Sequence, residues 1–383
     1  MQYHALGLIC HDPAALLWYI ACVISVMGRK AMGVRVGNVE FHAGPEDLGA
    51  PDELEAVIVD FIDGAQKRLD IAVQELENET IAKAIIRARQ RKVRVRMVIE
   101  QSYLKAATAR VDPWVSGGKH EANRRVHDAI LRAKIDVKVD YNSKIFHQKF
   151  IIRDGVSVLS GSTNFTPTGT HNNLNHVIII HDKKVAKIFS REFAEIQRGH
   201  FGKRNEGHDK TPTDTVVSDV PIRVLFAPDH SPEMEIMKQM LKARERIDFA
   251  IFTFSKSSGI DDTMLRLLDL NMPIQGVFDG GQGSQDWAPV DDLKAKGADL
   301  FFVHKRGQLG KLHHKLMVLD KQVVIGGSFN YTGPANHLND ENIIILGDLD
   351  TTSPAQKEAQ KKIASFALAE IERIIRDHAR PVT

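Results

Sequence analysis

The sequence predicts an α/β protein of two pseudo-symmetric lobes, each a mixed β-sheet flanked by helices, with an active site at the interface between the lobes. Two observations carry this prediction. A set of six residues occurs twice, and each residue of the first copy lies 166 positions before its partner in the second. In both halves, short apolar runs also alternate with helical segments of about ten residues or more, which is typical of α/β units.

The repeated elements occur in the same order in both halves. Each half is expected to have an amphipathic segment, a short β-strand, a helix and a second strand. In the first half these are 54–66, Leu69–Val73, 79–91 and Val93–Glu100. In the second half they are 233–245, Ile247–Phe252, 261–270 and Pro273–Asp279.

Domain boundaries follow from the repeat. We expect an apolar N-terminal segment over 1–38, a first lobe over 39–199, a polar linker over 200–219 and a second lobe over 220–383. The 383 residues suffice for two cores of ordinary size. Hydrophobic residues make up 43% and charged residues 26%, as in a typical globular protein.

The apolar stretch 14–27 allows three interpretations. It is short for a membrane span, and no positively charged segment of a signal peptide precedes it. It is therefore a packed or loosely attached helix, a membrane anchor, or sequence upstream of a true start at Met32. The cysteines, Cys10 and Cys22, lie near the N-terminus, so neither expected core depends on a disulfide. We expect a cytoplasmic protein, with membrane association through 14–27 left open.

The duplicated motif reads H-x-K-x4-D-x6-G-S-x-N. Its first copy is His147, Lys149, Asp154, Gly161, Ser162 and Asn164, and its second is His313, Lys315, Asp320, Gly327, Ser328 and Asn330. In a strand over Phe146–Arg153, His147 and Lys149 share one face, because side chains alternate. Asp154 falls on the other face beside a tight turn, so we interpret it and Asp320 as structural. His314 is out of register and is expected to face away from the site.

This pattern resembles the signature of the phospholipase D superfamily, the HKD phosphodiesterases, over most of the chain. The resemblance implies that one histidine attacks phosphorus and the other acts as general acid and then general base. By analogy, His147 is the nucleophile and His313 the general acid. Lys149 and Lys315 are expected to hold the phosphate oxygens. The phosphate-binding groups Ser162, Asn164, Ser328 and Asn330 complete this set.

An acidic residue beyond the G-S-x-N element supports a histidine in related enzymes. Glu341 is the candidate here, and its equivalent in the first half is Asn175. A carboxylate favours the imidazolium form and an amide does not, so the two histidines are expected to differ in pKa. The sequence does not say which histidine Glu341 contacts.

Local basic clusters favour a nuclease over other phosphodiesterases. About 13 extra residues in the first half fall within 103–125, where Tyr103 and Trp114 are interleaved with basic residues. A solvated loop explains this segment equally well. Candidate nucleic-acid contacts are Lys119, Arg124, Arg125, Lys305, Arg306 and Lys311. The main expectation is therefore a nuclease, such as an endonuclease, that cleaves DNA or RNA through a phosphohistidine.

The alternative is a lipid enzyme, either a phospholipase D or a cardiolipin synthase-like transferase, for which the 14–27 stretch is the best support. A non-catalytic phosphate-binding protein would be expected to lose a motif histidine or lysine, and none is lost. We expect no catalytic metal and no cofactor, because metal-ligand motifs are absent and the motif lysines would repel a cation. A monomer could suffice, and a homo-oligomer is also compatible.

Overall fold

The computed structural model describes residues 33–105, 112, 114–205 and 210–383, and residues 33–383 form one compact unit. The apolar stretch 14–27 and the question of its role lie outside the described residues. Within the described part of the chain, no helix is both long and apolar enough to cross a bilayer.

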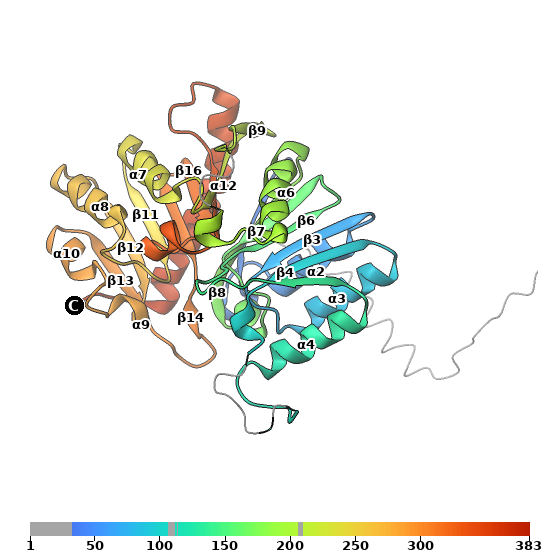
Figure 1. Cartoon of the computed structure of the whole chain (residues 1–383). Coiled ribbons are helices and arrows are strands. Elements are labelled where there is room, and N and C mark those ends of the chain that lie inside the picture. Colours follow the sequence, from blue (N-terminus) through green and yellow to red (C-terminus); the bar gives the residue numbers. More distant parts are fainter. Residues whose placement is uncertain (1–32, 106–111, 113, 206–209) are drawn as a thin grey trace, which may run out of the picture. The chain divides into compact units, whose positions relative to one another are not determined.

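The first half folds into a mixed sheet with the strand order β1-β2-β8-β7-β6-β3-β4-β5 (Figure 1). Strands β3, β4 and β5 pair in parallel, and β6, β7, β8 and β2 continue the sheet antiparallel. The strands are β1 (Val34–Val36), β2 (Val39–Gly44), β3 (Arg68–Val73), β4 (Arg94–Ile99), β5 (Asp136–Val139), β6 (Lys149–Arg153), β7 (Ser157–Gly161) and β8 (Asn173–Ile180).

The second half repeats this sheet with the order β18-β13-β12-β11-β15-β16-β17-β10-β9. Here β11, β12 and β13 are the parallel strands, and β15, β16, β17 and β10 run antiparallel. The strands are β9 (Thr215–Val217), β10 (Val220–Ala227), β11 (Ile247–Ile251), β12 (Ile274–Asp279), β13 (Asp299–Val303), β15 (Lys315–Leu319), β16 (Val323–Gly327), β17 (Glu341–Leu346) and β18 (Ala379–Pro381). The short β14 (Lys311–Leu312) crosses over to pair with β8 of the first sheet.

Most helices cover the outer faces of the two sheets. The first sheet carries α2 (Leu54–Asp63), α3 (Glu79–Gln90), α4 (Glu121–Arg132) and α5 (Pro167–His171). The second carries α7 (Pro232–Lys242), α8 (Gly259–Asp269), α9 (Gly280–Gly283), α10 (Val290–Ala295) and α11 (Gly333–His337). Short 3-10 turns are η1 (Glu46–Leu48), η2 (Gln101–Tyr103) and η3 (Gly202–Arg204).

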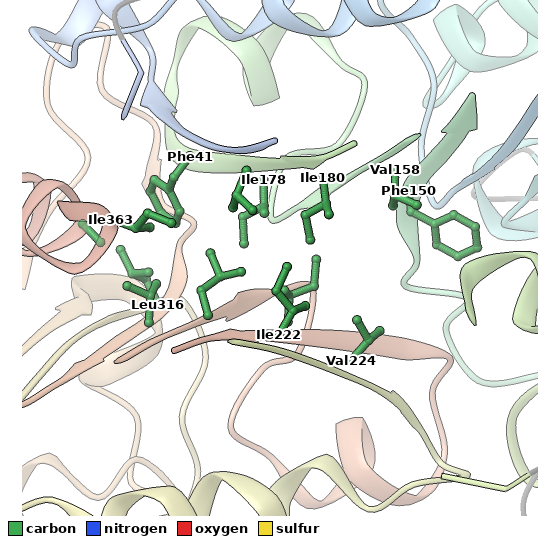
Figure 2. Close-up of a cluster of buried hydrophobic side chains, with 14 of the residues drawn as sticks. Phe41, Phe150, Val158, Ile178, Ile180, Ile222, Val224, Leu316 and Ile363 are labelled. Carbon is green, nitrogen blue, oxygen red and sulfur yellow. The ribbon is translucent and has the colours of Figure 1, made fainter. Parts of the chain in front are cut away.

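A shared core joins the inner faces of the sheets. Ile178 and Ile180 of β8 face Ile222 and Val224 of β10 across this core (Figure 2). Two long helices, α6 (Lys183–Arg198) and α12 (Pro354–His378), contribute to the same core, and each contacts both sheets. Because burial of apolar surface is the main force that stabilises folded proteins, this shared core fixes one lobe against the other. The α/β fold class with two similar halves is thereby confirmed.

Two segments differ from the sequence-based expectation. The expected linker 200–219 contains η3 and the edge strand β9, because Thr215–Val217 pairs with the start of β10. The expected strand over Phe146–Arg153 begins only at Lys149. Phe146 instead forms a β-bridge with Asp340 of the other half. The first motif histidine is therefore attached to the opposite lobe.

The motif aspartates each lie in a tight turn and bind three successive backbone N–H groups. Asp154 has a left-handed φ of 55° and accepts from the amides of Gln66, Lys67 and Arg68 at 3.0, 2.7 and 2.8 Å. Asp320 accepts in the same way from the amides of 244–246. Each carboxylate thus ties the motif turn to the residues that enter β3 or β11.

Replacing Asp154 by alanine is expected to lower the free energy of unfolding by about 1–3 kcal/mol, because three amides lose a charged acceptor. Urea unfolding would measure this loss, and Asp320→Ala should show a similar one. The turnover per folded molecule should change little in both variants. Full stability combined with lost turnover would contradict this structural role.

Candidate active site

The two motif histidines lie at the carboxyl ends of the parallel strands. Lys149 opens β6 opposite Val73, the last residue of β3, and Lys315 opens β15 opposite Ile251, the last residue of β11. Each histidine stands two residues earlier and is fixed by the other lobe. The amide of His147 donates to the Asp340 carbonyl at 3.0 Å. The amide of His313 donates to the Leu174 carbonyl at 2.9 Å.

Each imidazole is oriented by a side chain of the opposite lobe. His147 Nδ1 lies 2.7 Å from Glu341 Oε2. His313 Nδ1 lies 2.9 Å from Asn175 Oδ1. Since these oxygens accept, each Nδ1 carries the proton and Nε2 is left to meet a substrate. The structure therefore answers the open question of the sequence analysis, because Glu341 contacts His147.

The motif serines are placed differently from our expectation. We expected Ser162 and Ser328 to bind phosphate, but both are fully buried. The Ser162 hydroxyl donates to Asn175 Oδ1 at 2.8 Å, and the Ser328 hydroxyl donates to Glu341 Oε2 at 2.6 Å. They hold the residues that orient the histidines. The equal spacing of 162 to 175 and of 328 to 341 was the signal that could have revealed this.

The motif lysines are buried between the two lobes. Lys149 Nζ donates to the Gln74 side chain at 2.8 Å and to the His147 carbonyl at 2.7 Å. Lys315 Nζ donates to the His313 carbonyl at 2.9 Å and lies 5.0 Å from the centre of the Phe252 ring. Gln74 and Phe252 directly follow β3 and β11, and sequence reasoning missed both.

The motif asparagines present one polar atom each without a protein partner. Asn164 donates to Glu75 at 3.3 Å. Among the described residues, the buried side-chain oxygens of Asn164 and Asn330 accept no hydrogen bond. An amide that is oriented in this way has unused hydrogen-bonding capacity, which suits contact with a substrate.

Burial and mutual repulsion shift every titratable group of the site toward its neutral form. Burial lowers the pKa of His147 and His313 well below the ordinary value, and the motif lysines lower it further. Burial also lowers the pKa of Lys149 to about 7, and that of Lys315 also falls well below its usual range. Burial raises the pKa of Glu341, which Lys149 and Lys315 oppose. A bound anionic phosphate would raise the pKa of the lysines and histidines again, because a nearby negative charge favours their charged forms.

The pH dependence of turnover follows from Lys149. Its ammonium form is lost as the pH rises through about 7 in the free protein. We therefore expect kcat/KM for an anionic phosphodiester to fall as the pH rises from 6.5 to 9. A pH profile with a soluble nitrophenyl phosphodiester measures this, and Lys149→Met should lose the decline. A profile that stays flat to pH 9 would contradict the assignment.

The neighbouring residue His314 faces away from the site, as its register predicts. It is fully buried, and its ring stacks on His176 with centroids 5.4 Å apart. Its Nδ1 lies 3.1 Å from that of His176, and its Nε2 lies 3.4 Å from Glu370. The same place in the other motif holds an amide pair, in which Asn342 donates to Gln148 at 2.6 Å. The His176–His314 and Gln148–Asn342 contacts each join one lobe to the other, next to the catalytic histidines in sequence.

The candidate nucleic-acid contacts do not converge on this site. Arg124 pairs with Glu121 at 2.8 Å and Arg125 with Glu79 at 3.1 Å, so their charges are partly neutralised. Lys119 is exposed on the insertion. Lys305 and Arg306 line a separate open cavity of about 700 Å³. Of the six, Lys311 comes nearest, since its Nζ lies 5.2 Å from the Phe252 ring centre.

Acidic clusters that could hold a metal ion lie outside the histidine pair. Within the described residues, Glu75, Glu77 and His120 offer ligand atoms within 4.8 Å of one another. Two further groups are Glu53, Glu55 and His171, and Glu192, Glu195 and Asp229. None of the three includes a motif residue.

Two complete histidine–lysine pairs that meet between similar lobes define a two-motif HKD phosphodiesterase. The family model described as "Cardiolipin synthase, PLD-like domain" matches residues 58–197 and 236–363. The chain therefore belongs to this phospholipase D-like family, and the resemblance seen in the motifs is confirmed.

Curated relatives agree with this membership, and a solved structure shares the fold. A mitochondrial cardiolipin hydrolase of Xenopus laevis is 28% identical over 133 residues, which are 35% of this chain and 56% of that protein. A phospholipase D of Rickettsia felis is 33% identical over 132 residues, which are 34% of this chain and 58% of that protein. The chain thus matches little more than half the length of these relatives. Phosphatidylserine synthase of Haemophilus influenzae has the same fold, with a TM-score of 0.64, 12% identity and coverage of 95% of this chain and 91% of that one.

Proposed function

We propose that this phosphodiesterase cleaves or transfers the phosphodiester of a phospholipid, as a phospholipase D does. The observation that carries the proposal is the pair of histidines, each held through Nδ1 by an acceptor from the opposite lobe. The curated relatives, a cardiolipin hydrolase and a phospholipase D, supply the substrate class. The sequence alone favoured a nuclease. Those relatives support the lipid alternative better, and the ion pairs of Arg124 and Arg125 weaken the argument from basic residues.

In the proposed first step, His147 Nε2 attacks phosphorus. His313 enters this step as imidazolium, because the bound anionic phosphodiester favours the charged ring and Nε2 then carries a proton as well as Nδ1. The bond between phosphorus and the leaving oxygen breaks, and His313 gives that oxygen the proton of Nε2. Glu341 stabilises the positive charge that develops on His147, and the lysines stabilise the non-bridging oxygens. This assignment gives the carboxylate to the nucleophile and the neutral Asn175 to the general acid.

In the proposed second step, a water molecule attacks the phosphohistidine. His313 now takes the proton of that water, the nitrogen–phosphorus bond breaks, and His147 is regenerated. An alcohol in place of water gives transfer of the phosphatidyl group instead of hydrolysis. Dividing one displacement into two steps is ordinary nucleophilic catalysis.

The test is one assay in EDTA with four substrates in parallel. Vesicles of phosphatidylcholine with phosphatidylglycerol or cardiolipin, single-stranded DNA, duplex DNA and RNA are offered to the full chain. Release of phosphatidic acid that His313→Ala abolishes would support the proposal. Cleavage of a nucleic acid with untouched lipid would overturn it in favour of a nuclease, and loss of all turnover in EDTA would point to a metal-dependent chemistry.

A further inference from the structure

The described tryptophans are exposed, which is unusual for the largest apolar side chain. Trp114 has 94% of its surface exposed and Trp287 has 40%. Tyr141 is 85% exposed. Val115, which follows Trp114, and Ile145, four residues after Tyr141, are each about half exposed. A tryptophan with almost no protein contact contributes little to folding, so its exposure suggests contact with a partner.

These side chains occupy the same edge of both sheets. Trp114 lies in the segment that follows β4, Tyr141 and Ile145 follow β5, and Trp287 follows β12. These are parallel strands, so their carboxyl ends share the sheet edge at which β3 and β11 end. Since His147 and His313 lie at the ends of β3 and β11, the exposed aromatic residues lie on the active-site edge of each lobe.

Positive charge collects on the same loops. The described residues that follow β4, β5, β12 and β13 include the exposed cations Lys105, Lys119, Lys144, Lys305, Arg306 and Lys311. In these loops only Asp112 and Asp286 are exposed acids among the described residues. The Asp112 carboxylate is already used, because it accepts from the Trp114 amide at 2.9 Å. These loops therefore carry more exposed positive than negative charge, although the whole chain has a net charge of only +2.

We propose that this edge, with Trp114, Tyr141 and Trp287 as aromatic contacts and Lys305 and Arg306 as basic contacts, docks on the surface of an anionic lipid bilayer. Tryptophan and tyrosine partition to the headgroup region, and basic residues are attracted to anionic headgroups. The phosphodiester of a phospholipid lies in that same region. Docking thus brings the substrate to a site that is almost closed in the protein alone, where His147 and His313 are 7% and 8% exposed. The inference rests on the proposed lipid function.

A bilayer fits these features better than a nucleic acid does. A single strand is bound by aromatic residues along one basic groove. Here the aromatic residues are spread over both lobes, and two of the basic residues in the insertion are paired with acids. A broad, basic, aromatic edge instead matches a flat anionic surface.

The experiment measures the partitioning of the full chain onto phosphatidylcholine vesicles with and without 30% phosphatidylglycerol. We expect the double variant Trp114→Ala/Tyr141→Ala to partition about tenfold less or worse, the loss expected for large apolar side chains that leave an apolar environment. Lys305→Glu/Arg306→Glu should lose at least about tenfold on anionic vesicles only, since each basic residue near such a surface contributes about fivefold. Salt should weaken the binding that remains in the aromatic variant.

Matched controls come from the opposite sheet edge. Leu241 lies in the last turn of α7 and Leu270 directly follows α8, shortly before β11 and β12 begin, and these side chains are 60% and 65% exposed. Leu241→Ala/Leu270→Ala and the charge control Lys92→Glu/Arg94→Glu should partition like the unaltered protein. Equal losses in the controls, or unchanged partitioning of both active-edge variants, would overturn docking through this edge.

Turnover of a short-chain, monomeric phospholipid separates this inference from the proposed function. All four variants should hydrolyse it at the unaltered rate, which also shows that they fold. Loss of vesicle turnover with normal monomer turnover supports docking. Vesicle partitioning that depends on Trp114 without turnover of any lipid would reject the proposed function but not the docking. Weakened single-stranded DNA binding with unchanged partitioning would assign the edge to nucleic acid instead.

Discussion

Replacement of either motif histidine by asparagine is expected to lower turnover by about 10³-fold or more. His147 and His313 come from different lobes, and each Nδ1 is held by the opposite lobe, so each Nε2 is available to the substrate. Because they perform consecutive parts of one reaction, the double variant should be little worse than either single one. Steady-state kinetics with vesicle lipid and with a soluble nitrophenyl phosphodiester would measure these losses.

The matched control is His314→Gln, which places in the second motif the residue that the first motif has as Gln148. His314 packs against His176 and Glu370 on the far side of the strand, so its loss should affect stability more than chemistry. Substantial turnover in both His147→Asn and His313→Asn would reject the two-histidine mechanism. A loss in His314→Gln as large as theirs would show that packing, not chemistry, explains the motif.

Glu341→Gln is expected to lower turnover by up to about 10⁴-fold, the loss seen when a carboxylate that orients a catalytic imidazole is replaced by an amide. The amide can accept the Nδ1 proton of His147, but it cannot stabilise the positive charge that forms on the ring. Glutamine also removes the buried negative charge of Glu341, which favours the charged forms of Lys149 and Lys315, so thermal stability should be retained or reduced. Loss of that charge lowers the pKa of Lys149 further, and the alkaline decline of kcat/KM should move to lower pH.

Asn175→Asp tests the same difference between the two histidines by adding a carboxylate to His313 instead of removing one from His147. It gives His313 the carboxylate that His147 already has, which should raise the pKa of His313 and keep it protonated to higher pH. Proton release to the leaving oxygen then becomes harder, so we expect a modest decrease in turnover of a natural lipid. A substrate that leaves as nitrophenolate should be less affected. Equal effects of Glu341→Gln and Asn175→Asp on both substrates would contradict the division of roles.

The sequence was sufficient for the fold class because its evidence was periodic and duplicated. Alternation of apolar runs and helices predicted β3, α3 and β4 and their equivalents β11, α8 and β12 within a few residues. It did not predict the bridge of Phe146 to Asp340 or the pairing of β14 with β8. These contacts join residues that are far apart in sequence, and no local pattern encodes them.

The candidate site was predicted in composition but not in contacts. The motif spacing predicted one site for His147, Lys149, His313 and Lys315, and the family resemblance added Glu341. The structure buries all five residues. It also places Glu341 on His147, and it places His147 and the two lysines close enough to His313 to lower its pKa. Register alone could not show that the motif serines bind Glu341 and Asn175 instead of substrate. Nor could register show that Gln74 accepts a hydrogen bond from Lys149 or that Phe252 packs against Lys315.

The preference for a nuclease arose because a sequence shows charges but not their partners. Arg124 and Arg125 counted as free cations until the structure placed them beside Glu121 and Glu79. The side chain of Trp114 is almost fully exposed, which suits contact with a lipid surface as well as base stacking. Oligomeric state and cytoplasmic location stay predictions.

The most direct test of the central claim is the intact mass of His313→Asn after mixing with a nitrophenyl phosphodiester. Nitrophenolate leaves without a proton donor, so His147 can still attack, while the second step lacks its general base. We predict a stable adduct of one phosphoryl ester per chain, located on His147 by peptide mapping and absent from His147→Asn/His313→Asn. No adduct, or an adduct on a residue other than His147, would contradict a composite site in which His147 is the nucleophile.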